Sequence, residues 1–143
     1  MSLRKLRRAA RAASLIVLAA ALPLMIDYTA DWCTACRYME PALEASRTAW
    51  ADQIEFQTVD LTDSVYTADE APVRVVPTQA FFYADGTPYE PSDALKAVIS
   101  FAQVRDAVTG ELRYTLHEGG LTQQGLDAIL SELTQSAFST VDK

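Results

Sequence analysis

Cysteine and histidine are scarce in this chain of 143 residues, which contains two cysteines and one histidine. Small secreted domains held together by disulfides need more cysteines at long spacings, and a structural zinc site needs four ligands, so the composition argues against both classes. Basic clusters are missing from the body of the chain, and the net charge is −7. No nucleic acid partner is expected, because binding a polyanion requires clustered lysine and arginine.

The chain also lacks a long apolar run, although its start comes close to one. Five of the twelve basic residues lie within residues 1–11, and a largely apolar stretch over residues 12–25 follows. This pattern is typical of a signal peptide or a short membrane anchor, with Ala19–Ala21 as a small-residue cleavage site, but the run is short for a transmembrane span. An ordinary first helix is the alternative, because alanine and arginine favour helices.

These features divide the chain into a basic and apolar leader over residues 1–21, one domain over residues 22–137 and a tail over residues 138–143. The leader, read as a signal or anchor, predicts membrane attachment through residues 1–21 and a location in the bacterial cell envelope. Read as an ordinary helix, it predicts a cytoplasmic protein.

Hydrophobic periodicity predicts strands that alternate with helices in the first part of the domain and a hairpin in the second part. The predicted strands span residues 22–29, 54–61, 78–83, 98–104 and 112–117. The predicted helices span residues 34–49, 62–71 and 122–133. Early alternation builds parallel strands with crossover helices, and the late hairpin adds antiparallel edges. The sequence therefore predicts an α/β fold with a central mixed β-sheet flanked by helices and an extended C-terminal β-hairpin.

Both cysteines lie where the first predicted strand passes into the first predicted helix. A helix N-terminus favours a thiolate, because its free N–H groups and its dipole favour negative charge, so Cys33 is the expected nucleophile. Cys36 lies one helical turn further on and within disulfide reach. We expect Cys33 to be exposed and to attack, and Cys36 to lie deeper and to resolve. An inert or metal-related pair is the alternative.

The segment from Asp27 to Cys36 resembles the active-site stretch of thioredoxins, in which a buried aspartate lies six residues before the nucleophilic cysteine. Pro41 falls where that superfamily kinks its active-site helix. Residues 76–78, Val-Pro-Thr, are similar to its cis-proline loop, and residues 118–120, Glu-Gly-Gly, are similar to its closing segment. The resemblance covers about residues 22–133 and implies a thioredoxin-like three-layer fold.

The resemblance also implies roles for single residues. Cys33 would be the attacking thiolate, Cys36 the resolving thiol, and Asp27 a buried proton acceptor for Cys36 whose pKa is raised by desolvation. A cis Pro77 would lie against the disulfide and leave the backbone of Val76 free to pair with a substrate strand. The implied substrate-binding residues are Trp32, Val76, Pro77 and Thr78.

Four residues depart from the thioredoxin pattern or lie outside it. Phe56 stands where thioredoxins often place a basic residue, so proton handling around Asp27 is expected to differ. Thr34 and Ala35 replace Gly-Pro between the cysteines, which leaves the direction of electron flow open. His117 is expected at the surface, at the end of a strand.

The resulting hypothesis is a thiol-disulfide oxidoreductase that exchanges electrons with protein thiols and disulfides, uses no cofactor, and works with a reductase or a membrane electron carrier. The alternative is a thioredoxin-fold module that holds a soft metal such as Cu(I) on the cysteine pair without turnover, with Met39 as the further ligand candidate closest in sequence. A third possibility is a static structural disulfide.

Overall fold

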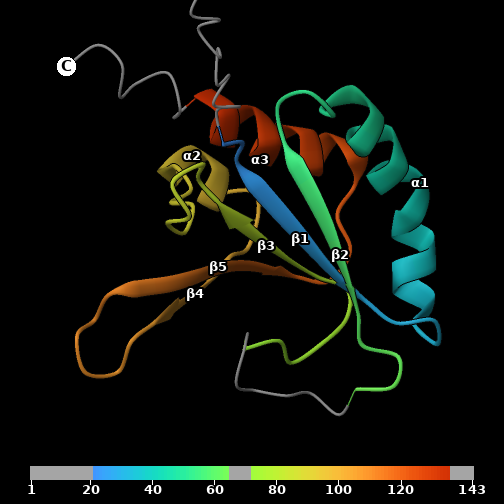
Figure 1. The fold of residues 1–143 in the computed structure, drawn as a ribbon, viewed down its shortest axis with the longest axis horizontal. Coiled ribbons are helices and arrows are strands. Elements are labelled where there is room, and N and C mark those ends of the chain that lie inside the picture. Colours follow the sequence, from blue (N-terminus) through green and yellow to red (C-terminus); the bar gives the residue numbers. More distant parts are fainter. Residues whose placement is uncertain (1–20, 65–71, 136–143) are drawn as a thin grey trace, which may run out of the picture.

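The computed structural model describes residues 21–64 and 72–135 (Figure 1). In chain order, the elements within these residues are β1 (Leu24–Thr29), α1 (Thr34–Ala49), β2 (Glu55–Asp60), β3 (Thr78–Phe82), α2 (Asp93–Lys96), β4 (Ala102–Arg105), β5 (Leu112–Glu118) and α3 (Gln123–Gln135).

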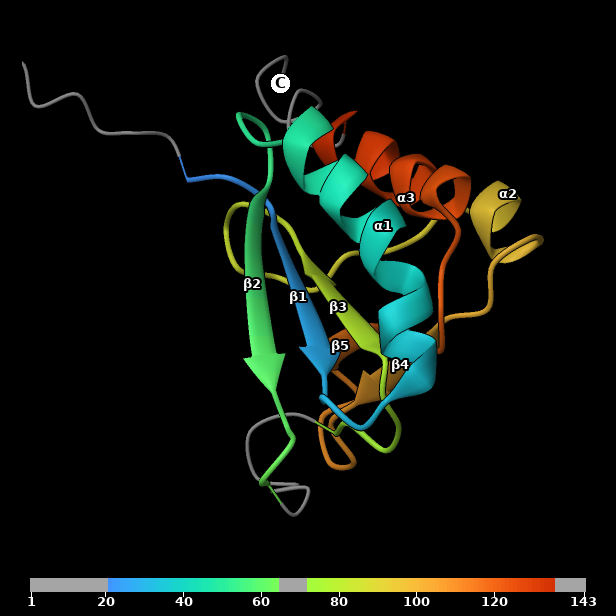
Figure 2. The ribbon, with the colours of Figure 1, turned by 90° about the vertical axis from the view of Figure 1, so that its right-hand side faces the viewer.

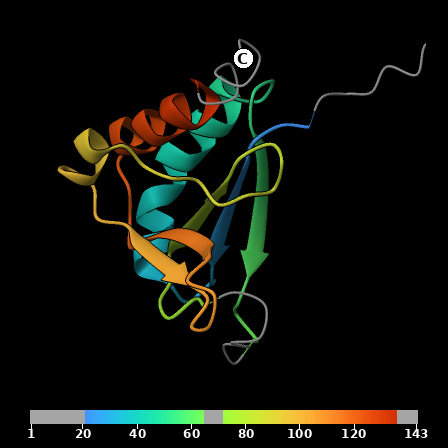
Figure 3. The same cartoon turned by 90° about the vertical axis from the view of Figure 1, so that its left-hand side faces the viewer.

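The described strands form one five-stranded sheet in the order β2-β1-β3-β5-β4. β1 pairs in parallel with β2, and the remaining pairs are antiparallel. The predicted mixed sheet is therefore confirmed. β4 and β5 form the C-terminal hairpin, which extends away from the rest of the sheet in Figure 1 and points toward the viewer in Figure 3. β1 lies between β2 and β3, so its carboxyl end is held by strands on both sides.

The main core lies between the sheet and the helices α1 and α3, which cover the same face (Figure 2). Met25 from β1 and Phe81 from β3 point into this core. α3 contributes four fully buried residues at helical spacing, Leu126, Ile129, Leu130 and Leu133. Each such side chain contributes about 1.5–3 kcal/mol through burial. Tyr28, Ala80 and Leu116 form a second cluster on the opposite face.

Helix α1 spans 16 residues, and its bounds agree with the predicted ones. Its buried face is formed by Cys36, Met39, Leu43 and Ser46, which recur every three or four residues. Pro41 lies inside the helix, as the sequence predicts. Because this face includes the second cysteine, packing of α1 against the sheet also fixes the position of Cys36.

Asp127 links the two long helices. Its Oδ1 accepts hydrogen bonds from Ser46 Oγ at 2.9 Å and from Trp50 Nε1 at 3.1 Å. Asp127→Ala removes the acceptor while the Ser46 hydroxyl stays fully buried, so we expect a loss of about 1–3 kcal/mol in the free energy of unfolding, measured by urea titration. Asp127→Asn keeps an acceptor oxygen and should lose less. An unchanged urea midpoint for the alanine variant would contradict this account.

Two predicted elements differ from the structure. The helix predicted over residues 62–71 begins instead with a turn at residues 62–63, and residues 65–71 lie outside the described part. The strand predicted from residue 98 starts only at Ala102, because α2 precedes it. The Ser92 side chain caps α2, and the N–H groups of Val98 and Ile99 continue its turns by donating to the Leu95 carbonyl.

The predicted leader lies outside the described residues except for Ala21, as does the predicted tail over residues 138–143, and both stay predictions. Within residues 21–64 and 72–135, no helix has the length and apolar character needed to cross a bilayer.

Candidate functional site

A disulfide joins Cys33 and Cys36 at the start of α1, with 5.3 Å between their Cα atoms. Cys33 is the N-cap residue of the helix, and its Sγ accepts a hydrogen bond from the Cys36 backbone N–H at 3.1 Å. A turn closed by the Cys33 N–H and the Ala30 carbonyl leads from β1 into this cap. The sequence prediction that both cysteines lie at a strand-to-helix junction is confirmed.

The surroundings of the Cys33 sulfur favour negative charge. The first turn of α1 carries no acidic side chain, so the helix dipole and the free N–H groups act on the sulfur unopposed within that turn. The guanidinium of Arg37 donates to the Asp31 carbonyl at 2.7 Å, which keeps a positive charge beside the turn that precedes Cys33. A hydrogen bond from an N–H to a charged acceptor contributes about 1.5–3 kcal/mol, which favours the thiolate form of Cys33 once the disulfide is opened.

Burial does not distinguish the two cysteines in the predicted way. Cys33 is 5% exposed and Cys36 is 7% exposed, because Ala30 and Val76 pack against the pair. The expectation that Cys33 is the exposed member is therefore wrong for the disulfide form. The difference between the two sulfurs lies in the helix cap, which involves Cys33. Trp32, which precedes Cys33 in the chain, is 58% exposed, and its predicted role as an apolar rim stays a prediction.

Asp27 lies in the middle of β1 and is 5% exposed. Its pKa is raised, chiefly because burial removes water from the carboxylate, while a hydrogen bond from Gln79 and the charge of Arg47 lower it and the charge of Glu40 raises it. Gln79 Nε2 lies 3.4 Å from Asp27 Oδ1 and 3.4 Å from the sulfur of Met39. Met39 lies one turn beyond Cys36 on the buried face of α1. Asp27 is therefore buried beneath the helix that carries Cys36.

The loop before β3 contains a cis peptide bond between Val76 and Pro77. Two contacts with the end of β5 hold this loop in place. The Gly119 N–H donates to the Pro77 carbonyl at 2.8 Å, and Arg74 forms an ion pair with Glu118 at 2.7 Å.

Val76 from this loop packs against the cysteine pair. The resemblance implies this place for Pro77 and a substrate-pairing backbone for Val76, and both roles stay predictions. Thr78 differs from its predicted role in substrate binding. Its side chain is fully buried, and its hydroxyl donates to the Val75 carbonyl at 2.8 Å, so it stabilises the loop from inside.

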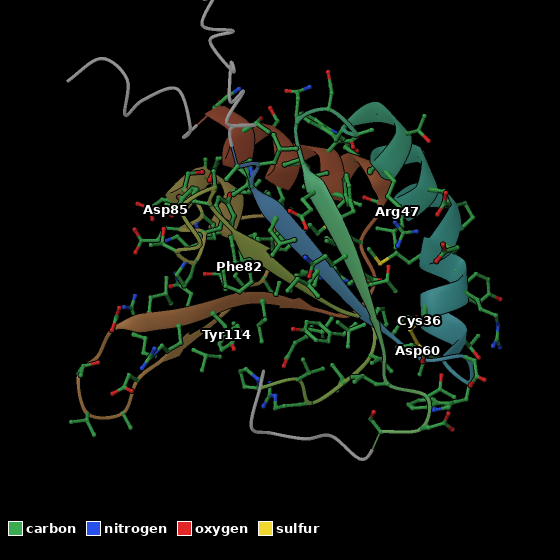
Figure 4. The ribbon with its side chains drawn as sticks, viewed as in Figure 1. Cys36, Arg47, Asp60, Phe82, Asp85 and Tyr114 are labelled. Atoms are coloured by element: carbon green, nitrogen blue, oxygen red, sulfur yellow. A yellow bond between two sulfur atoms is a disulfide. The ribbon has the colours of Figure 1, made fainter. Side chains whose placement is uncertain are left out.

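A small cavity of about 200 Å³ lies beside Cys36 and opens to the surface. Asp31, Arg37 and Asp60 are among its lining residues. Figure 4 shows Cys36 and Asp60 at the same end of the sheet, with Arg47 further along α1. Hydrogen bonds from the Thr62 side chain and backbone lower the pKa of Asp60, so this carboxylate stays ionised near the opening. The cavity gives solvent a route to Cys36.

The structure also places two residues whose role the sequence did not reveal. His117 was expected at the surface but is 9% exposed, and its Nδ1 lies 2.9 Å from Gln79 Oε1. Gln79 is fully buried. A signal for Gln79 was present, because strand alternation puts it on the same face as the buried Phe81, where a glutamine requires polar partners. Nothing in the local sequence indicated the burial of His117.

The donor set does not favour a metal on the cysteine pair. Among the residues that the structure describes, no group of three or more histidine, cysteine, aspartate or glutamate side chains is placed to hold a metal ion. Met39, the nearest further ligand in sequence, is buried, and its sulfur accepts from Gln79. The soft-metal alternative therefore has no support from the site.

Comparison with known proteins agrees with this geometry. The family model described as Thioredoxin matches residues 11–103. The chain is 35% identical over 66 residues to the thioredoxin of Rhodospirillum rubrum, which covers 46% of this chain and 64% of that protein. It is 29% identical over 84 residues to the thioredoxin of Alicyclobacillus acidocaldarius subsp. acidocaldarius, which covers 54% of this chain and 79% of that protein.

Similarity at the level of the fold extends further along the chain. The X-ray structure of Fasciola hepatica thioredoxin superposes with a TM-score of 0.53 at 19% sequence identity, covering 79% of this chain and 82% of that one. Because the family model matches well over half of the residues, this chain belongs to the thioredoxin family.

Proposed function

We propose that this protein is a thiol-disulfide oxidoreductase that exchanges electrons with protein disulfides through Cys33 and Cys36. The observation that carries the proposal is the position of the disulfide at the N-terminus of α1, where the Cys36 N–H is directed at the Cys33 sulfur. Membership of the thioredoxin family supports the same chemistry. The disulfide seen in the structure is the oxidised state of the proposed cycle.

In the reducing direction, the Cys33 thiolate attacks one sulfur of a substrate disulfide. The substrate S–S bond breaks, a mixed disulfide forms, and the leaving substrate sulfur takes a proton. The Cys36 thiol then loses its proton and attacks the Cys33 sulfur, which releases the second substrate thiol and forms the Cys33–Cys36 disulfide. Two electrons pass to the substrate, and its two thiolates take their protons from water. The reverse sequence oxidises a substrate dithiol.

Asp27 is the proposed proton acceptor for Cys36 in the second step. Burial raises its pKa, which makes it a stronger base than an exposed aspartate. The opening beside Cys36 supplies a path by which the proton can then leave to water.

The proposed docking surface for substrate surrounds the cysteine pair. Trp32 would supply an exposed apolar rim, and Val76 from the loop before β3 packs against the pair. An extended substrate segment would pair with the backbone of Val76 as an added strand and present its disulfide to Cys33. Completion of the cycle requires a redox partner, a reductase or a membrane electron carrier, that exchanges electrons with the Cys33–Cys36 disulfide.

An insulin-reduction assay with dithiothreitol as electron donor tests the proposal. The wild-type protein should accelerate reduction of the insulin disulfides well above the dithiothreitol background, and Cys33→Ser should return the rate to that background. Val108→Ser is a matched control, because Val108 lies at the tip of the hairpin and is 94% exposed. Its rate should equal that of the wild type. A wild-type rate no higher than background would refute the proposed activity and favour a static disulfide.

A further inference from the structure

Three buried polar side chains lie in a row across the sheet on the face covered by α1. Asp27 on β1 is directly opposite Gln79 on β3, and Gln79 is directly opposite His117 on β5. Their exposed fractions are 5%, 0% and 9%. Burying polar groups costs free energy unless they form hydrogen bonds. Three of them side by side in the core therefore suggest a function. The dithiol chemistry described above uses only its first member.

The hydrogen bonds within the row point in one direction. Gln79 Nε2 donates to Asp27 Oδ1 at 3.4 Å, so its Oε1 faces His117 as an acceptor. Nδ1 of His117, at 2.9 Å, must then carry a proton. The His117 imidazole therefore donates to the side-chain carbonyl of Gln79, and the side-chain NH₂ of Gln79 donates to the carboxylate of Asp27. A donor of this kind stabilises the ionised form of Asp27 relative to the protonated form.

The charged groups around the row act from other elements. Arg47 and Glu40, both on α1, influence Asp27 with opposite signs. The Arg47 guanidinium is shared among Glu40 at 3.2 Å, Glu44 at 2.5 Å and Thr58 on β2 at 2.8 Å. Its positive charge is therefore largely matched by these two acids. Phe56, at the position where thioredoxins often carry a basic residue, packs against the main core.

The outer end of the row lies close to solvent. His117 lines an open depression of about 520 Å³ together with Ile99 and Leu121. The pKa of His117 is lowered, because the effect of burial outweighs a backbone hydrogen bond with Gly119 and the charge of Glu118, which both raise it. The ring is therefore neutral at neutral pH. A neutral ring protonated on Nδ1 matches the donor that Gln79 requires.

We propose that Gln79 and His117 are positioning residues for Asp27: the amide, held by the imidazole, fixes the carboxylate beneath α1 and sets the pH range over which it exchanges the proton of Cys36. The proposal deepens the proposed function and rests on it for the role of Asp27 in release. In this chain the polar contact to the buried acid comes from β3, the strand on the other side of β1 from β2.

The test is the titration of Asp27 itself, followed by NMR of its side-chain carboxyl carbon in the reduced protein. Gln79→Leu removes the donor, and the midpoint of the titration should rise by about half a pH unit or more. His117→Leu should also raise the midpoint, but by less than Gln79→Leu does. His117→Asn can still donate to Gln79 and should return the midpoint to the wild-type value. Single-turnover release of a mixed disulfide should show its pH dependence displaced in the same direction.

Thr115→Val is the matched control, because Thr115 is fully buried on the same strand as His117 and its hydroxyl donates to the Tyr89 carbonyl, away from the row. It should lower stability and leave the Asp27 midpoint unchanged. Gln79→Met replaces Gln79→Leu if the latter does not fold. An unmoved midpoint in the Gln79 variant, or an equal movement in Thr115→Val, would overturn the proposal. The NMR titration needs no turnover, so its outcome is separate from that of the insulin assay.

Discussion

Cys36→Ala is expected to accumulate a stable mixed disulfide with a substrate protein, whereas Cys33→Ser is expected to form none. In the alanine variant the thiolate of Cys33 is still held at the N-cap of α1, so the first exchange proceeds, but no second thiol is present to release the substrate. Multiple-turnover activity should fall to background in both variants. Non-reducing electrophoresis with insulin, followed by mass spectrometry of the adduct, distinguishes them.

The matched control for this pair is Cys33→Ser combined with Cys36→Ala, which should form no adduct. Stable adducts on Cys36 in the Cys33→Ser variant would contradict the assignment of the nucleophile. The result matters because exposure alone does not assign it, given that both cysteines are nearly equally buried in the disulfide form.

Asp27→Asn is expected to slow release of the mixed disulfide by about 100-fold at neutral pH, the lower end of the range for general-base catalysis. Formation of the mixed disulfide should change little, because the helix cap that favours the Cys33 thiolate stays intact. Single-turnover kinetics measure the two steps separately. Equal slowing of both steps would indicate a structural role for Asp27 and would contradict its role as the acceptor for Cys36.

The same substitution should also change how stability depends on pH. The folded-state pKa of Asp27 is raised by burial, so the unfolded chain loses this proton at lower pH than the folded protein does. The contribution of Asp27 to stability is therefore fully present below the ordinary range of an aspartate and is lost as pH rises through the raised value. Asp27→Asn should remove this loss and be more stable than the wild type above that range, as urea titrations at several pH values would show.

Local sequence signals were sufficient for the elements that carry the dithiol. The run of apolar residues before Cys33 predicts β1, and the spacing of Met39 and Leu43 predicts a half-buried α1. Both elements are present, and the cysteines lie at their junction. The cis peptide bond before Pro77 followed only from the resemblance to thioredoxins, because most X-Pro bonds are trans.

The parts that the sequence did not predict depend on contacts between distant segments. Gln79 is 52 residues from Asp27 and 38 residues from His117, and only the register of three strands brings them together. α2 has four residues and depends on the Ser92 cap, so it is too short to produce a periodic pattern. The burial of both cysteines depends on Val76, which reaches the pair from the loop before β3.

The assignment of Cys33 as the nucleophile is tested by alkylating the reduced protein with iodoacetamide across a range of pH and identifying the modified residue by mass spectrometry. We expect Cys33 to be modified rapidly at neutral pH and Cys36 to stay largely unmodified, because the cap of α1 favours the thiolate of Cys33. Preferential modification of Cys36, or a Cys33 that reacts no faster at neutral pH than an ordinary cysteine, would contradict this assignment.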